Sequence, residues 1–103
     1  MRKVLWWLLG GTRGGKNRLR IIEHLAAEPM NANQLAETLD LDYKTVRHHL
    51  DLLAEHDVVT TVGEGYGTMY FLSDTMDEHM DVLDEVADAA GLRVDADGGG
   101  ADE

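Results

Sequence analysis

The sequence of 103 residues predicts an α+β fold with a three-helix core, a β-hairpin after it, and one further helix at each end of the chain. Apolar residues recur every three or four positions in residues 16–27, 31–39 and 42–56, the pattern of amphipathic helices. Two runs rich in β-branched and aromatic residues, 58–62 and 68–72, flank a glycine-rich turn, the pattern of a hairpin. The length suits one small domain with a modest core.

Residues 1–13 combine an apolar helix with the start of a basic, glycine-rich loop. Trp6 and Trp7 carry more apolar surface than a solvated helix keeps in water. We expect them to pack across a dimer interface; burial within the monomer and a membrane contact are the alternatives. The apolar run is too short to span a bilayer, and no small-residue cleavage site follows it.

Glycines at positions 10, 11, 14 and 15 interrupt the helical pattern, and basic residues are densest around them. A glycine-rich loop that leads into a helix N-terminus favours anion binding. The spacing falls short of a nucleotide-binding loop, because Asn17 stands where a hydroxyl residue belongs and no strand precedes the loop. One interpretation is that the loop contacts the phosphates of a DNA backbone; the alternative is a plain solvated loop. The candidates for anchoring a DNA backbone are Arg13, Lys16, Arg18 and Arg20.

The core domain is expected over residues 14–73 and begins with the helix at 16–27, which ends before Pro29. In the next helix Asn31 can cap the N-terminus while Gln34 reaches back, the spacing of a capping box. A turn of three residues then leads to the third helix, and two short helices joined in this way form a helix-turn-helix. Residues expected to face the core are Leu19, Ile22, Leu25, Ala26, Leu35, Ala36 and Leu39.

The third helix, residues 42–56, has the features of a recognition helix. Asp42 is a good N-cap. The outward face is basic in its first half and acidic in its second, which suits a helix that enters the major groove by its N-terminal end. Arg47 and Asp51 lie four residues apart, so a surface ion pair is the alternative. The inward face holds Val46, His49, Leu50 and Leu53. Candidates for base and phosphate contacts are Tyr43, Lys44, Thr45, Arg47 and His48, with Asn33 and Gln34 on the preceding helix.

A helix-turn-helix followed at once by a hairpin is a winged helix. The tip of this wing, residues 64–66, has no Lys or Arg. Since phosphate contacts dominate DNA affinity, the wing is expected to contribute little to binding. The hairpin residues expected in the core are Val58, Val62, Met69 and Phe71.

A final helix is expected over residues 74–92, capped by Ser73 or Asp74 and ended by Gly91. Its apolar residues alternate four- and three-residue spacing, which is typical of a coiled-coil seam. The acidic, glycine-rich segment 93–103 is expected to be a disordered tail. The seam includes Met76, Met80, Leu83 and Ala87.

The motifs Asn33-Gln-Leu-Ala-Glu37 and Leu41-Asp-Tyr-Lys-Thr-Val-Arg-His-His-Leu50 carry a family resemblance. Over residues 14–90 the chain resembles the winged-helix repressors of the ArsR type, and more closely the small acidic winged-helix regulators of haloarchaea. The resemblance implies a cytoplasmic transcriptional repressor that binds DNA sequence-specifically. It also implies a homodimer built by the terminal helices, so that dimer symmetry matches a pseudo-palindromic site. Residues expected in the dimer interface are Trp6, Trp7, Met76, Met80, Leu83 and Ala87.

The net charge of −11 at first argues against DNA binding, but the charge is unevenly distributed. Residues 1–47 carry eight Lys and Arg against five Asp and Glu, whereas residues 48–103 carry one against fifteen. Abundant acid with few lysines suits a halophilic cytoplasm, where salt screens self-repulsion. The rival interpretation is a winged helix that contacts another protein in a transcription-related assembly, which the net charge and the acidic wing favour.

Catalytic and metal sites have little support in the sequence. The absence of cysteine excludes disulfides and thiolate metal sites. Asp77 and His79 begin a metal-binding pattern that some ArsR-like repressors have on the last helix, but the chain has Ala90 and Arg93 where the remaining ligands belong. No set of nucleophile, base and orienting residue is recognisable. We expect no enzymatic activity and no cofactor.

Overall fold

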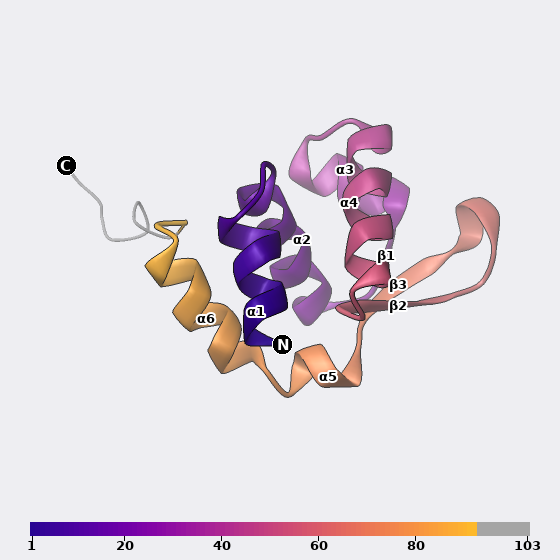
Figure 1. The fold of residues 1–103 in the computed structure, drawn as a ribbon. Helices are drawn as coiled ribbons and strands as arrows, with labels where there is room; N and C mark the ends of the chain where they lie inside the picture. The colour runs from indigo at the N-terminus through magenta and orange to yellow at the C-terminus, as the bar shows by residue number, and fades with distance from the viewer. Residues whose placement is uncertain (93–103) are drawn as a thin grey trace.

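The structure, a computed structural model, describes residues 1–92; the tail expected over 93–103 lies outside the described residues. Figure 1 shows the helices gathered in one body, with α6 beside α1 and the β2–β3 hairpin projecting away from the helices. The elements in chain order are α1 (Arg2–Leu5), the π-helical turn η1 (Trp6–Gly10), α2 (Gly15–Ala27), β1 (Met30–Asn31), α3 (Ala32–Leu39), α4 (Tyr43–Glu55), β2 (Val59–Val62), the 3₁₀ turn η2 (Gly65–Gly67), β3 (Met69–Leu72), α5 (Asp74–Asp77) and α6 (Met80–Ala89).

The two helices of the predicted helix-turn-helix begin at the expected caps. Asn31 Oδ1 accepts a hydrogen bond from Gln34 N at 2.8 Å, and Gln34 Oε1 accepts from Asn31 N at 2.9 Å, so the capping box is confirmed. Asp42 Oδ2 accepts from Lys44 N and Thr45 N at the start of α4. Between the helices the chain reverses at a residue with φ 57°, which ends α3 in the left-handed conformation. These local bonds set the angle at which α4 is presented.

The hairpin is confirmed, but its expected inward pattern is partly wrong. The sheet has three antiparallel strands in the order β1-β3-β2, with the short β1 on the outer edge of β3. Val58 is buried as expected, whereas Val62 is 63% exposed and the buried side chain of β3 is Tyr70. The hairpin extends past the helices (Figure 1), so its distal residues have no layer above them. The expected core residues Met69 and Phe71 are only half-buried.

The N-terminal segment is part of the core rather than an appendage. Leu5, Leu8 and Leu9 are buried together with the leucines and isoleucines of α2. Gly15 opens α2 so close to this segment that a Cβ there would lie 1.9 Å from the carbonyl oxygen of Leu9. Because α2 is covered by η1 as well as by α3 and β3, its buried face is wider than expected. Ile21 is buried along it, while Ala26, expected to be inward, is exposed.

The final helix is divided, and most residues expected in the dimer seam are buried within a single chain. Ser73 caps α5 by accepting from Met76 N, but the helix is interrupted at residues 78–79 before α6 begins. Met76 on α5 is fully buried against its own chain, and so are Leu83 and Ala87, because α6 packs on α1 and η1. Their surface is therefore covered within the monomer, and Met80 alone of the seam is half-buried. None of the helices over residues 1–92 has the length and hydropathy needed to cross a membrane.

Candidate nucleic-acid interface

The N-terminal half of α4 presents polar side chains outward, as the sequence predicted. Lys44, Thr45 and His48 are exposed, while Val46 and Leu50 on the opposite face are fully buried. This division follows from the helical period, which turns every third and fourth residue toward the core. The exposed face is shaped to enter a groove without disturbing the packing of the helix.

Arg47 contacts its own helix on both sides. Its Nη1 donates to Tyr43 Oη at 3.2 Å, and its Nη2 lies 3.7 Å from Asp51 Oδ1. The hydrogen bond to Tyr43 contributes most to raising the pKa of Arg47. The surface pair considered as the alternative for Arg47 is therefore present in the free protein. A base contact by this guanidinium requires it to leave Asp51.

The tip of the wing approaches the start of α4. The ring of Tyr66, an exposed residue of η2, has its centroid 6.0 Å from that of Tyr43, tilted by 41°. This distance lies within the range of favourable aromatic pairs. The wing contributes no cation here, but its aromatic tip shares a surface with the recognition helix. The sequence offered only a tyrosine in a glycine-rich turn, which does not predict this contact.

Arg18 was expected on the surface as a DNA anchor, and the structure corrects this. The side chain is only 2% exposed. Its Nε donates to the carbonyl of Leu8 at 2.7 Å, its Nη2 to the carbonyl of Arg13 at 2.7 Å and to the hydroxyl of Thr12, and its Nη1 lies 3.2 Å from His49 Nδ1. The guanidinium falls on the inward side of α2, where it satisfies one carbonyl of η1 and one of the glycine-rich loop. It joins this loop to α4.

His49 is held neutral by its surroundings. Burial lowers its pKa, and the charges of Arg18 and His48 lower it further. Since an arginine only donates hydrogen bonds, Nδ1 of His49 must accept from Arg18. A neutral imidazole with an accepting Nδ1 carries its proton on Nε2. The buried histidine expected from the sequence is thus present, with a defined tautomer.

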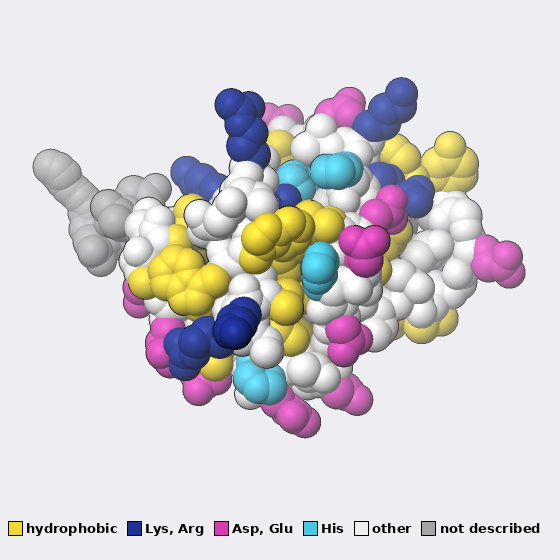
Figure 2. Space-filling model, in the orientation of Figure 1, with side chains coloured by type: hydrophobic (Ala, Val, Ile, Leu, Met, Phe, Trp, Pro, Cys, Tyr) yellow, Lys and Arg dark blue, Asp and Glu magenta, His cyan; other side chains and the backbone are white. Residues whose placement is uncertain are grey.

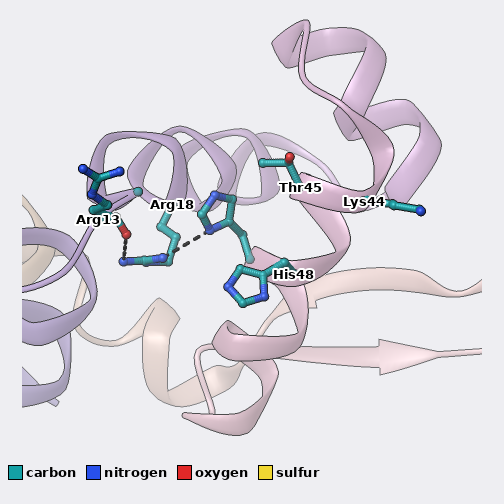
Figure 3. Close-up of a pocket in the computed structure, with 7 residues that line it drawn as sticks. Arg13, Arg18, Lys44, Thr45 and His48 are labelled. Atoms are coloured by element: carbon teal, nitrogen blue, oxygen red, sulfur yellow. Dashed lines mark hydrogen bonds between the residues drawn. The ribbon is translucent and has the colours of Figure 1, made fainter.

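An open pocket of about 400 Å³ lies between the glycine-rich loop and α4. Arg13 and Lys44 stand at its two ends, with Thr45 and His48 between them, as Figure 3 shows. The lining contains no carboxylate. The complete lining is Arg13, Gly14, Arg18, Lys44, Thr45, His48 and His49. The predicted residues Arg13, Lys44, Thr45 and His48 are therefore brought together.

The other predicted residues are less available or lie apart. Arg20 donates to the carbonyl of Leu39 at 3.1 Å and to Asn17 Oδ1 at 3.4 Å, so its half-buried side chain ties α2 to the end of α3. The amide of Gln34 belongs to the capping box. Lys16 and Asn33 are exposed. Figure 2 shows long cationic side chains extending from the upper edge of one face, while acidic side chains gather along its lower edge.

Comparison with known families supports this description of the domain. Residues 16–62 match a family model described as a helix-turn-helix domain. The matched segment runs from the start of α2 to the end of β2, and with the antiparallel sheet it is consistent with a winged helix. Residues 16–62 are therefore similar to a helix-turn-helix domain, a type of module that binds DNA, and α3 and α4 have this arrangement in the structure. A comparison with curated proteins found no match.

Proposed function

We propose that the protein is a sequence-specific DNA-binding transcriptional regulator that places α4 in the major groove. The observation that carries this proposal is the exposed, cationic N-terminal half of α4 within a segment that matches a helix-turn-helix domain. Lys44, Thr45 and His48 would contact bases and phosphates, and Arg13 the backbone beside them. Tyr43 and Arg47 complete the contact surface, with Arg47 exchanging Asp51 for DNA.

We further propose that the regulator is a homodimer. Trp6 and Trp7 are 41% and 45% exposed on η1, although the leucines on either side of this pair are buried. Two large aromatic side chains on one short turn favour a protein contact. Because the seam of α6 is covered within the monomer, the interface would be formed by the tryptophans and the outer face of α6 rather than by Leu83 and Ala87. Dimer symmetry would then set the spacing of two half-sites.

A repressor role, a halophilic host and a cytoplasmic location rest on the resemblance to haloarchaeal regulators and on composition. The excess of 20 Asp and Glu over 9 Lys and Arg suits high salt, where repulsion among the acidic side chains is screened. A need for molar salt in folding is the measurement that tests the halophilic proposal. The regulator would act by binding alone, with neither catalysis nor a cofactor.

The DNA-binding proposal is tested by fluorescence anisotropy with genomic DNA fragments, titrated over a range of KCl concentrations at which the protein is folded. We expect the logarithm of the binding constant to fall linearly with the logarithm of salt concentration, with a slope that counts the phosphates contacted. Lys44→Gln should reduce the slope by about one. The matched control is Lys3→Gln, which removes one exposed charge on α1. A wild-type protein that is folded but does not bind refutes the proposal.

The second candidate is a winged helix that binds another protein. The net charge of −11 and the absence of Lys and Arg from the wing favour it. Two of the four candidate backbone anchors do not extend the cationic surface beside Lys44, because Arg18 is buried and Arg20 is bonded to α3. The dimer proposal is tested by sedimentation of the wild type and of Trp7→Ser. A monomeric wild type refutes the homodimer.

A further inference from the structure

We propose that the pocket between the glycine-rich loop and α4 is a seat for one phosphate group, supplied by the DNA backbone. This inference rests on the proposed function and adds to it a specific site, with a floor inside the protein and donors from two elements. The pocket opens beside the N-terminal half of α4. A helix that enters the major groove by this end brings a backbone phosphate next to its first turns.

The first support is a buried cation without a counter-ion. The guanidinium of Arg18 bonds to two backbone carbonyls, the Thr12 hydroxyl and His49 Nδ1, all of them neutral acceptors. Over residues 1–92 no carboxylate forms a salt bridge with it. A buried charge is costly unless an opposite charge compensates it. An anion in the pocket that Arg18 lines would supply that compensation.

The second support is a donor at the wall of the pocket that no protein group occupies. His49 is 6% exposed, and its Nδ1 is occupied by Arg18, so its remaining proton is on Nε2. In the part of the chain that the structure describes, Nε2 has no hydrogen-bond partner. This atom lies under the loop, 3.4 Å from where a Cβ on Gly14 would stand, and His49 lines the pocket. An oxygen of a bound phosphate can accept this bond.

The rim supplies the remaining donors. Thr45 contributes a hydroxyl, and His48 an imidazole whose ring centroid is 5.8 Å from that of His49. Arg13 and Lys44 add two exposed positive charges from opposite ends (Figure 3). Donors that converge from several directions, with no carboxylate among them, match the oxygens of a phosphate rather than a neutral or cationic ligand.

Arg18 acts in this site as a positioning residue. By donating to Nδ1 it fixes the tautomer of His49, and by donating to the carbonyl of Arg13 and the hydroxyl of Thr12 it holds the loop beside α4. Gly14 has φ +85°, and a Cβ there would lie 2.6 Å from His49 Cε1, so a side chain at this position would displace the imidazole. The loop, the arginine and the histidine thus form one preorganised unit.

The test combines DNA binding with NMR of the imidazole groups of the full chain. Arg13→Gln removes a rim charge at an exposed position, and Lys3→Gln is the matched control on α1. We expect Arg13→Gln to weaken DNA binding about tenfold at low salt and to reduce the salt slope by about one, with Lys3→Gln unchanged. Thr45→Val should weaken binding without changing the slope, because it removes a donor but no charge. DNA should also shift the His49 imidazole signals of the wild type.

The outcomes separate the site from the proposed function. DNA binding in which Arg13→Gln behaves like Lys3→Gln and the His49 signals stay in place overturns the phosphate seat, while the regulator proposal stands. If the wild type does not bind DNA, the proposed function fails, and inorganic phosphate added to the free protein decides the site. A saturable shift of His49 that is weakened in Arg13→Gln retains a phosphate seat served by free anions. The absence of any shift overturns it.

Discussion

Replacing Gly15 by alanine should destabilise the protein, although helix propensity alone predicts the opposite sign. Gly15 is the first residue of α2, and alanine is favoured over glycine in a helix interior by about 1 kcal/mol. The structure places the backbone of Leu9 directly against this position. A Cβ on Gly15 would lie 1.9 Å from the Leu9 carbonyl oxygen and 2.7 Å from its carbon.

The size of the effect follows from this clash. Real Cβ atoms essentially never have neighbours closer than 3.0 Å, so η1 and α2 must separate by at least about 1.1 Å, the difference between 3.0 and 1.9 Å. The atoms in the way are backbone, which has no alternative rotamer. The displacement also disturbs the bond from Arg18 Nε to the carbonyl of Leu8, which is 2.7 Å long. Overpacking costs about 1–3 kcal/mol in typical cores, and we expect about 3 kcal/mol here.

Urea denaturation and thermal melting measure the effect. A domain of this size loses about 4–8 °C in Tm for each kcal/mol, so Gly15→Ala should melt more than about 10 °C lower. The matched control is Gly67→Ala at the end of η2, where a Cβ meets nothing within 4 Å. The control should lie within about 0.5 kcal/mol of the wild type. A Gly15→Ala protein as stable as the wild type would refute the close packing of η1 on α2.

Three further measurements test other parts of the structure. Because folding lowers the pKa of His49, the unfolded state binds more protons than the folded state. The urea midpoint should therefore fall as the pH drops below the ordinary value of 6.5, until the pH passes the folded-state pKa. His49→Gln, which can still accept a hydrogen bond from Arg18, should flatten this fall. Leu83→Ala should lower the free energy of unfolding by about 2–5 kcal/mol at any protein concentration. A loss that depends on protein concentration would mean that Leu83 is buried in a dimer interface instead. Asp40→Gly should raise stability by up to about 1 kcal/mol, since Asp40 has φ 57°, and a loss would mean that its side chain stabilises the turn.

The parts of the fold that local chemistry determines could be predicted from the sequence. Asn31 with Gln34, and Asp42 before α4, are caps whose bonds involve residues at most three positions apart. The inward face of α4 follows from the period of a single helix, and Val46 and His49 are buried as that period requires. Such features need no knowledge of which elements pack together. Because these features also orient Lys44 and Thr45, the part of the candidate interface on the exposed face of α4 could be predicted in the same way.

Two of the errors, those for the last helix and for Arg18, lie where distant segments meet. A four-three spacing in α6 indicates that an apolar face is covered, but not whether α1 or a second chain covers it, and Leu83 proved to be covered by its own chain. Arg13 and Arg18 lie five residues apart in the same basic stretch, yet Arg13 is exposed and Arg18 is buried. What distinguishes them is that the side chain of Arg18 turns toward η1 and α4. A contact between Arg18 and His49 spans 31 positions and leaves no periodic trace in the sequence.

The N-terminal segment connects the proposed dimer contact to the proposed DNA contact. The turn η1 exposes Trp6 and Trp7 on one side and offers the carbonyl of Leu8 to Arg18 on the other. Trp7 also lies against His56 at the end of α4, with ring centroids 5.2 Å apart. The middle of α4, through Arg18 and His49, and its C-terminal end are therefore held by the segment that would carry the dimer interface. A partner docked on the tryptophans would hold two recognition helices through a rigid connection rather than a flexible linker. The two half-sites should then tolerate little variation in spacing, and inserting a single base pair between them should abolish the gain in affinity from the second half-site.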